Sequence, residues 1–183
     1  MKVSLIREDL AAGLGIVSRV VTGKAQLPVL ANILIEAEKL GVRLSATNLE
    51  LGFRVWLRGK VSQEGKITVP ARSFLEFVNS LASESVELET EGEKVKIRSG
   101  RYSAMLAGIG AGEFPDMGVV TGGKKISVKK RMIEEIAKEV AYAAAADESR
   151  PVLTGIQFKV DPSASSGQVL VVTATDGFRL ARK

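Results

Sequence analysis

The chain contains no cysteine and no histidine among its 183 residues, and both absences narrow the chemistry available to it. Without cysteine there is no disulfide framework, and nothing indicates an oxidising compartment. Imidazole bases, thiolate nucleophiles and ordinary zinc sites are likewise excluded. No Asp/Glu cluster has the spacing of a calcium-binding loop. We therefore expect neither a metal nor another cofactor.

Long apolar runs are also missing, so the sequence predicts no membrane span, and the amino terminus lacks the pattern of a signal peptide. A hydrophobic fraction of 45% and a charged fraction of 26% are typical of a soluble globular protein, for which a cytoplasmic location is expected. The net charge of +5 favours a polyanionic partner only weakly, because many proteins carry such a charge for solubility alone.

The glycine-rich segments do not have the spacing of nucleotide-binding loops. A dinucleotide-binding loop must be followed by a helix, but residues 108–112 are followed by Phe114-Pro115. Gly23-Lys24 and Gly123-Lys124 lack the upstream glycine and the following hydroxyl residue of a phosphate-binding loop. Since nothing arranges lysine, serine or carboxylate side chains for catalysis, we expect that the protein is not an enzyme.

What the sequence does contain is an internal repeat. A lysine followed by apolar, hydroxyl and apolar residues occurs three times, at 2–5, 66–69 and 125–128. Residues 27–30 return as 150–153 at the offset that relates the first copy to the third, and residues 46–49 return as 174–177 after a short insertion. A fixed period is typical of an architecture built from repeated units.

Each repeat predicts a strand, then a helix, then further strands. The helices are indicated by apolar residues at helical spacing around 10–21, 70–81 and 133–144. The expected strands are 2–7, 29–36, 42–47, 49–57, 86–90, 95–99, 102–107, 152–160 and 169–175, with a last one beginning near Phe178. The fold class is α+β, with repeated strand-helix-strand-strand-strand units and helices on one face of antiparallel sheets.

The glycine-rich stretch 108–123 has no hydrophobic period and is the natural boundary between domains. We expect a first domain of two units at 1–120 and a second, truncated domain at 121–183. Half a domain would expose a large apolar face, so the chain is expected to be a fragment of a longer protein.

The motifs that carry a family resemblance lie at 27–30, 46–50, 69–72, 97–101, 114–115 and 174–181. In this order they resemble the bacterial sliding clamp, the beta subunit of DNA polymerase III, over the whole chain. The resemblance implies a DNA clamp fold, a head-to-tail homodimer closing into a ring around duplex DNA, and a non-catalytic processivity factor for the replicative polymerase. It also implies as partners the polymerase catalytic subunit, the clamp loader and repair proteins.

By the same resemblance, helices with basic side chains should line the hole and contact phosphates without reading bases. The candidate DNA-binding residues are Arg7, Arg19, Lys24, Arg72 and Arg150. The alternative is a solvated helix surface of the usual kind, because pairs of opposite charge four residues apart also occur.

The resemblance further implies a groove that receives short peptides from partner proteins, formed by Leu153, Thr175, Gly177, Phe178, Arg179 and Leu180. The alternative is an Asp-Gly turn between two paired strands. A dimer edge is expected at Phe74, Phe77, Tyr102 and Met105, where an unpaired strand could extend a partner's sheet. Two further functions stay open, a basic duplex-DNA-binding module that does not encircle DNA and a peptide-binding scaffold.

Overall fold

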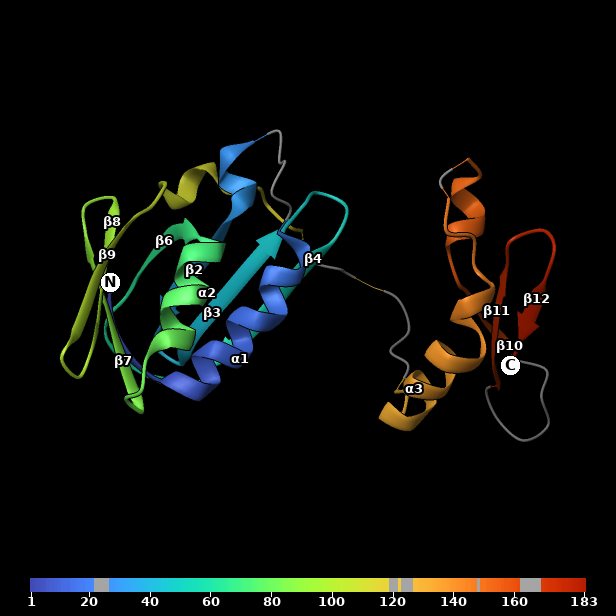
Figure 1. Cartoon of the computed structure of the whole chain (residues 1–183), viewed down its shortest axis with the longest axis horizontal. Coiled ribbons are helices and arrows are strands. Elements are labelled where there is room, and N and C mark those ends of the chain that lie inside the picture. Colours follow the sequence, from blue (N-terminus) through green and yellow to red (C-terminus); the bar gives the residue numbers. More distant parts are fainter. Residues whose placement is uncertain (22–26, 119–121, 123–126, 148, 162–168) are drawn as a thin grey trace. The chain divides into compact units, whose positions relative to one another are not determined.

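The computed structural model describes residues 1–21, 27–118, 122, 127–147, 149–161 and 169–183. They belong to two compact units, Met1–Val120 and Thr121–Lys183 (Figure 1). Among the described residues, no helix combines the length and the apolar character needed to cross a membrane.

The described residues of the first unit form two antiparallel sheets and two α-helices. Its strands are β1 (Lys2–Ile6), β2 (Asn32–Glu38), β3 (Gly41–Thr47), β4 (Gly52–Leu57), β5 (Gly59–Gln63), β6 (Gly65–Pro70), β7 (Ser85–Glu91), β8 (Lys94–Ser99) and β9 (Tyr102–Ala107). Its helices are α1 (Arg7–Val17) and α2 (Ala71–Ser80), with short 3-10 turns η1 (Ser18–Val20), η2 (Pro28–Ala31) and η3 (Ala111–Glu113). The strand orders are β5-β1-β7-β8-β9 and β4-β3-β2-β6.

Helices α1 and α2 lie side by side and bury one apolar stripe each (Figure 1). Leu10, Leu14 and Val17 of α1 are fully buried, as are Phe74 and Val78 of α2. These side chains meet the inward faces of both sheets in one continuous core. The helical spacing of apolar residues therefore determines which helix face is covered.

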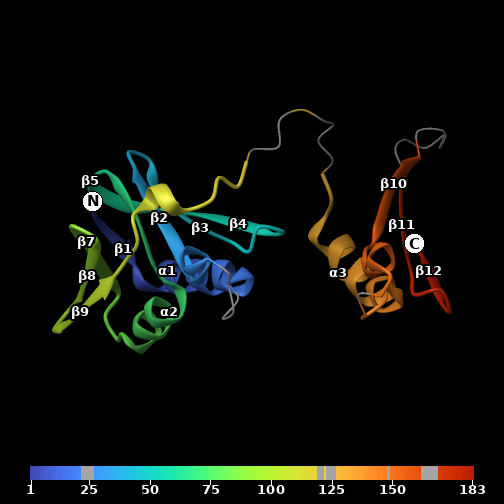
Figure 2. The same cartoon turned by 90° about the horizontal axis from the view of Figure 1, so that it is seen from above.

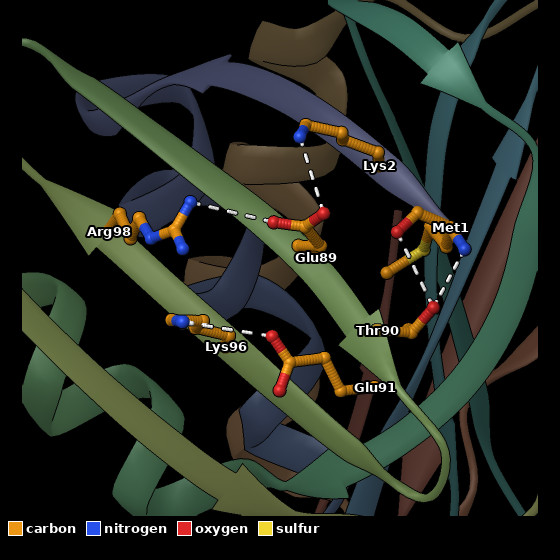
Figure 3. Close-up of polar contacts among 7 residues, drawn as sticks. All are labelled: Met1, Lys2, Glu89, Thr90, Glu91, Lys96 and Arg98. Carbon is orange, nitrogen blue, oxygen red and sulfur yellow. Dashed lines mark hydrogen bonds and ion pairs between the residues drawn. The ribbon is translucent and has the colours of Figure 1, made fainter.

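The central strands of the five-stranded sheet, β1, β7 and β8, alternate between a core face and a solvent face. Its core face is formed by Val3, Leu5, Val86, Leu88, Val95 and Ile97. On the solvent face, Glu89 forms ion pairs with Lys2 at 3.2 Å and with Arg98 at 3.5 Å (Figure 3). Glu91 forms an ion pair with Lys96 at 3.7 Å. Such exposed cross-strand pairs stabilise a sheet only modestly, so the buried face contributes most of the free energy of folding.

The second unit has one sheet and a smaller core. Its elements are α3 (Lys130–Glu139), η4 (Ala141–Ala143), η5 (Pro151–Thr154), β10 (Gln157–Asp161), β11 (Val169–Thr175) and β12 (Leu180–Arg182). The antiparallel strand order is β10-β11-β12. The buried core is Ile136, Val140, Ala143, Val172, Ala174 and Ala181. Lys183 joins the sheet to α3 through ion pairs with Glu135 at 2.6 Å and Glu139 at 2.7 Å.

The α+β class is confirmed, while several expected boundaries are wrong. The strands expected at 29–36 and 152–160 begin later, because Pro28 and Pro151 each open a 3-10 turn. Proline has no N–H to give to a sheet and favours the first position of a helical turn. The strand expected from 49 begins at Gly52, after a turn, and β5 was not predicted.

Two helices are shorter than their apolar patterns indicate. Helix α1 ends at Val17 and continues as the 3-10 turn η1, and α3 ends at Glu139, before η4. In the third repeat, residues 125 and 126 lie outside the described residues, and residues 127–129 are not in a strand.

Candidate functional site

The turn between β11 and β12 is held by side-chain hydrogen bonds to the backbone. Thr175 Oγ1 donates to the carbonyl oxygen of Arg179 at 2.7 Å and accepts from the N–H of Gly177 at 3.1 Å. Asp176 Oδ1 accepts from the N–H groups of Phe178 and Arg179, both at 2.9 Å. Gly177 has φ +92°, a left-handed conformation that glycine adopts without a steric penalty. This geometry keeps the tip of the turn in one shape.

The same hydrogen bonds determine the electrostatics of the turn. The backbone N–H groups of Arg179 and Phe178 lower the pKa of the Asp176 carboxyl, and the Arg179 charge adds to the effect. Arg179 Nε lies 2.9 Å from Asp176 Oδ2, and its guanidinium stands 5.7 Å from the ring centroid of Tyr142. Arg179 is therefore oriented by a carboxylate and an aromatic ring while staying exposed.

Large apolar side chains of η4, η5 and the turn itself face solvent. Phe178 is 100% exposed, Val152 90%, Leu180 65% and Tyr142 58%, while Leu153 is half-buried. Neither Tyr142 nor Val152 was among the residues expected here. Only the tertiary structure shows that both side chains face solvent.

Arg150 lies beside this turn. A Cβ atom placed on Gly177 would be 3.5 Å from Arg150 Nη1 and 4.0 Å from Leu153 Cδ1. The carbonyl oxygen of Leu153 accepts from the N–H of Ala145 at 2.9 Å, which ties η5 to the residues after η4. Arg150 was expected with the DNA-binding residues, but the structure places it with the peptide-binding candidates. We call Tyr142, Arg150, Val152, Leu153, Thr175, Gly177, Phe178, Arg179 and Leu180 the turn cluster.

The other basic candidates lie on or beside the helices of the first unit. Arg7 begins α1 and pairs with Glu8 at 3.4 Å, and exposed Arg72 in the first turn of α2 pairs with Glu76 at 2.8 Å. The hydrogen bond with Glu76 raises the pKa of Arg72. Arg19 lies exposed on η1. Lys24 falls outside the described residues.

Acidic side chains balance this basic set. Glu8 and Asp9 accompany Arg7 in the first turn of α1, where they complement the helix dipole. With Glu76 on α2, three acidic side chains face the three basic ones that α1, η1 and α2 carry, Arg7, Arg19 and Arg72. These helices do not form a strongly cationic surface.

The four residues of the expected dimer edge differ in how far they are exposed. Phe74 is fully buried in the core, and so its ring cannot contact another chain. Phe77 is half-buried and packs against the same core. Tyr102 and Met105 are 43% and 47% exposed on β9, the last strand of the five-stranded sheet. Of the four residues, these two are the exposed ones, and the dimer contact itself stays a prediction.

Comparison with known proteins decides the family. The model of the DNA polymerase III beta subunit, N-terminal domain, matches residues 1–118, and that of its central domain matches residues 127–183. The chain belongs to the DNA polymerase III beta subunit family. This confirms the resemblance on which the sequence interpretation depended.

Individual beta-subunit relatives agree with this assignment. The Beta sliding clamp of Synechocystis sp. is 34% identical over 99% of this chain and 47% of its own length. The Bacillus subtilis sliding clamp structure superimposes over the whole chain with a TM-score of 0.92 at 27% identity, covering 49% of that clamp. The Caulobacter crescentus pol III beta structure gives 0.91 at 30% identity, also over 49% of its length. The chain thus spans about half the length of the relatives it matches.

Proposed function

We propose that the protein is a sliding clamp that encircles duplex DNA and holds the replicative polymerase for processive synthesis, without catalysing a reaction. The observation that carries the proposal is the match of the chain, over almost its whole length, to curated beta sliding clamps. Encirclement requires no bond to be made or broken, which agrees with a sequence that has neither histidine nor cysteine.

In this proposal Arg7, Arg19, Lys24 and Arg72 contact phosphates in the hole. The acidic neighbours of Arg7 and Arg72 limit the strength of such contacts. Weak, sequence-independent contacts suit a ring that must move along DNA. Each phosphate that a basic side chain neutralises strengthens electrostatic binding, and strong binding would slow this movement. Topology rather than affinity then keeps the protein on its substrate.

The turn cluster is proposed to receive a short peptide from the polymerase, the clamp loader or repair proteins. Phe178, Leu180 and Val152 supply exposed apolar area, and Arg150 and Arg179 supply donors for peptide carbonyls or carboxylates. An exposed apolar group ringed by oriented polar side chains is typical of an interaction surface.

Strand β9 is the proposed dimer edge. It pairs with β8 on one side and ends the five-stranded sheet, so its other side could extend a partner's sheet. Tyr102 and Met105 would supply apolar contacts along this edge.

Encirclement is tested by loading the product of the full-length reading frame onto nicked circular DNA with a clamp loader. The salt concentration is then raised, and the circle is cut with a restriction enzyme. Retention on the intact circle and loss after cutting are expected, because a closed ring leaves only at a DNA end. Equal salt-sensitive release from circular and linear DNA would instead indicate a basic module that does not encircle DNA.

The peptide surface is tested separately by fluorescence anisotropy with a labelled clamp-motif peptide of the replicative polymerase. Leu180→Ala should weaken binding about tenfold if Leu180 is a central contact. Leu40→Ala is the matched control, because Leu40 is 99% exposed in the first unit and outside the turn cluster. Equal affinities of both variants and the unmodified protein would contradict the assignment of the turn cluster.

A further inference from the structure

The four-stranded sheet has a polar face on the side away from α1 and α2. Its register places Arg54 opposite Ser45, Arg43 opposite Glu36, and Glu36 opposite Lys66. Apolar side chains such as Ile35 and Leu44 point to the core instead. Figure 2 shows α1 and α2 on one side of β2 and β3, and the segment around η3 on the other.

A hollow of about 220 Å³ lies between this polar face and residues 111–117. Its charged lining residues are Glu36, Arg43, Arg54, Lys66 and Asp116. Since a water molecule occupies about 30 Å³ in the liquid, the hollow has room for several waters or for one small solute. The lining therefore decides which solute would be preferred.

The acceptors of the hollow are already engaged. Glu36 Oε2 accepts from Arg43 Nε and lies 2.9 Å from Arg43 Nη2. Asp116 Oδ1 accepts from the N–H of Gly118 at 3.0 Å. A dissolved cation would have to compete with these partners. Nor does any group of three acidic side chains come together in the described parts of the chain.

Two of the basic side chains that line the hollow lack such partners. Within the described residues, neither Arg54 nor Lys66 has an ion-pair partner. Ser45 is 1% exposed, and its hydroxyl oxygen is buried without a hydrogen-bond partner. That oxygen has almost no solvent-accessible surface, so it lies beneath the floor of the hollow, and the donors that a ligand could reach are those of Arg54 and Lys66.

We propose that this hollow binds a small oxyanion, of the phosphate or carboxylate class, between Arg54 and Lys66 and above Ser45. Arginine presents a planar fork of N–H groups to such an anion, and lysine adds a compact positive charge. Asp116 opposes the ligand through its negative charge. The site is separate from the helices and the turn cluster, and its failure would leave the proposed function untouched.

Isothermal titration calorimetry of the 183-residue chain with inorganic phosphate at constant ionic strength tests the site. We expect saturable binding that Arg54→Gln weakens about tenfold, because one charge-assisted contact is lost. Arg58→Gln is the matched control, since it removes the same charge just beyond the end of β4 and outside the lining. The single tryptophan, Trp56, pairs with Arg43 across the strands and gives a second, fluorescence readout.

Asp116→Asn provides a test of opposite sign. The amide keeps an Oδ1 acceptor for the N–H of Gly118 but removes the negative charge. Phosphate should therefore bind about threefold more tightly, or better. A variant that merely disturbed the fold would not gain affinity.

A parallel titration with acetate distinguishes the two anion sources. Saturation by phosphate alone would assign the site to phosphate groups, and equal saturation by acetate would assign it to carboxylates. No saturable binding of either anion would overturn the proposal. Equal weakening by Arg54→Gln and Arg58→Gln would also overturn it, because that result indicates only general charge attraction.

Discussion

Residues 47–51 of the first unit and residues 175–179 of the second form the same turn. Thr47 Oγ1 donates to the carbonyl oxygen of Leu51 at 2.8 Å, as Thr175 does to that of Arg179 at 2.7 Å. Asn48 Oδ1 accepts from two N–H groups at 2.8 and 3.1 Å, in the manner of Asp176. The duplication visible in the sequence therefore extends to individual hydrogen bonds.

The surfaces around the two turns differ in their chemistry. In the first unit, Leu27, Leu49 and Leu51 take the places that Arg150, Gly177 and Arg179 occupy in the second. The neighbouring 3-10 turns also diverge, since Val29 is 4% exposed and its counterpart Val152 is 90% exposed. The comparison teaches that a duplicated backbone can keep its internal hydrogen bonds while the side chains on its surface change.

The largest difference in stability between the two units is expected when the leucines of the 3-10 turns η2 and η5 are truncated. Leu30 is 5% exposed, so Leu30→Ala should lower the free energy of unfolding by about 2–4 kcal/mol through the cavity it leaves. Leu153 is half-buried, and Leu153→Ala should cost less than about 1 kcal/mol while weakening peptide binding. Urea unfolding and the peptide anisotropy assay measure both effects. Equal losses of stability would mean that the two turns bury these leucines alike.

Removing the threonine hydroxyl should have the next largest effect. Thr47 is 5% exposed, and Thr47→Val leaves the part-buried N–H of Leu49 without its partner, at about 1–3 kcal/mol. The Leu51 carbonyl keeps the N–H of Asn48 at 3.2 Å. Thr175→Val should cost about 1 kcal/mol, because water can reach the half-buried groups of its turn. Urea unfolding of the two variants compares them, and a larger loss for Thr175→Val would contradict this reasoning.

Exchanging the residues with positive φ tests the backbone strain. Leu49 has φ +78°, so Leu49→Gly should relieve strain and change the unfolding free energy by no more than about 1 kcal/mol, in the stabilising direction. Gly177→Leu should destabilise by about 1–2 kcal/mol through φ alone, because its new Cβ would make ordinary contacts with Arg150 and Leu153. Thermal unfolding of both variants measures the exchange, and Gly177→Ala controls for side-chain size.

The smallest difference between the two turns is expected in how the stability of each depends on pH. Backbone N–H groups lower the pKa of Asp176 in the folded protein, so its contribution to stability is present above the unfolded-state pKa. That contribution is lost as the pH falls below about 4 and through the folded-state pKa. Asn48 does not titrate. Asp176→Asn should therefore flatten the acid limb of the stability curve, and Asn48→Asp should steepen it.

Acid titration monitored by circular dichroism measures this limb. Glu89, Glu135 and Asp147 also have lowered pKa values, so the difference between each variant and the unmodified protein is the relevant quantity. Identical acid limbs for Asp176→Asn and the unmodified protein would mean that the turn does not stabilise the ionised form of the Asp176 carboxyl over its protonated form.

The sequence by itself determined the repeat, the α+β class and the family. Apolar residues at helical spacing located the regions of α1, α2 and α3, and alternation located β7, β8 and β9 within a residue or two. These patterns are local, and the burial of one face follows from the hydrophobic effect wherever the pattern occurs. The Asp-Gly turn was likewise visible, since its hydrogen bonds lie within five consecutive residues.

Only the tertiary structure decided which apolar side chains face solvent. Phe74 and Phe178 are the same residue type, yet one is fully buried and the other fully exposed. Arg150 precedes β10 in the sequence but lies against Gly177, and the hollow above Ser45 joins β3, β4 and β6 to residues 111–117. Such neighbours are brought together by sheet register and chain reversal, which depend on packing between segments far apart in the sequence.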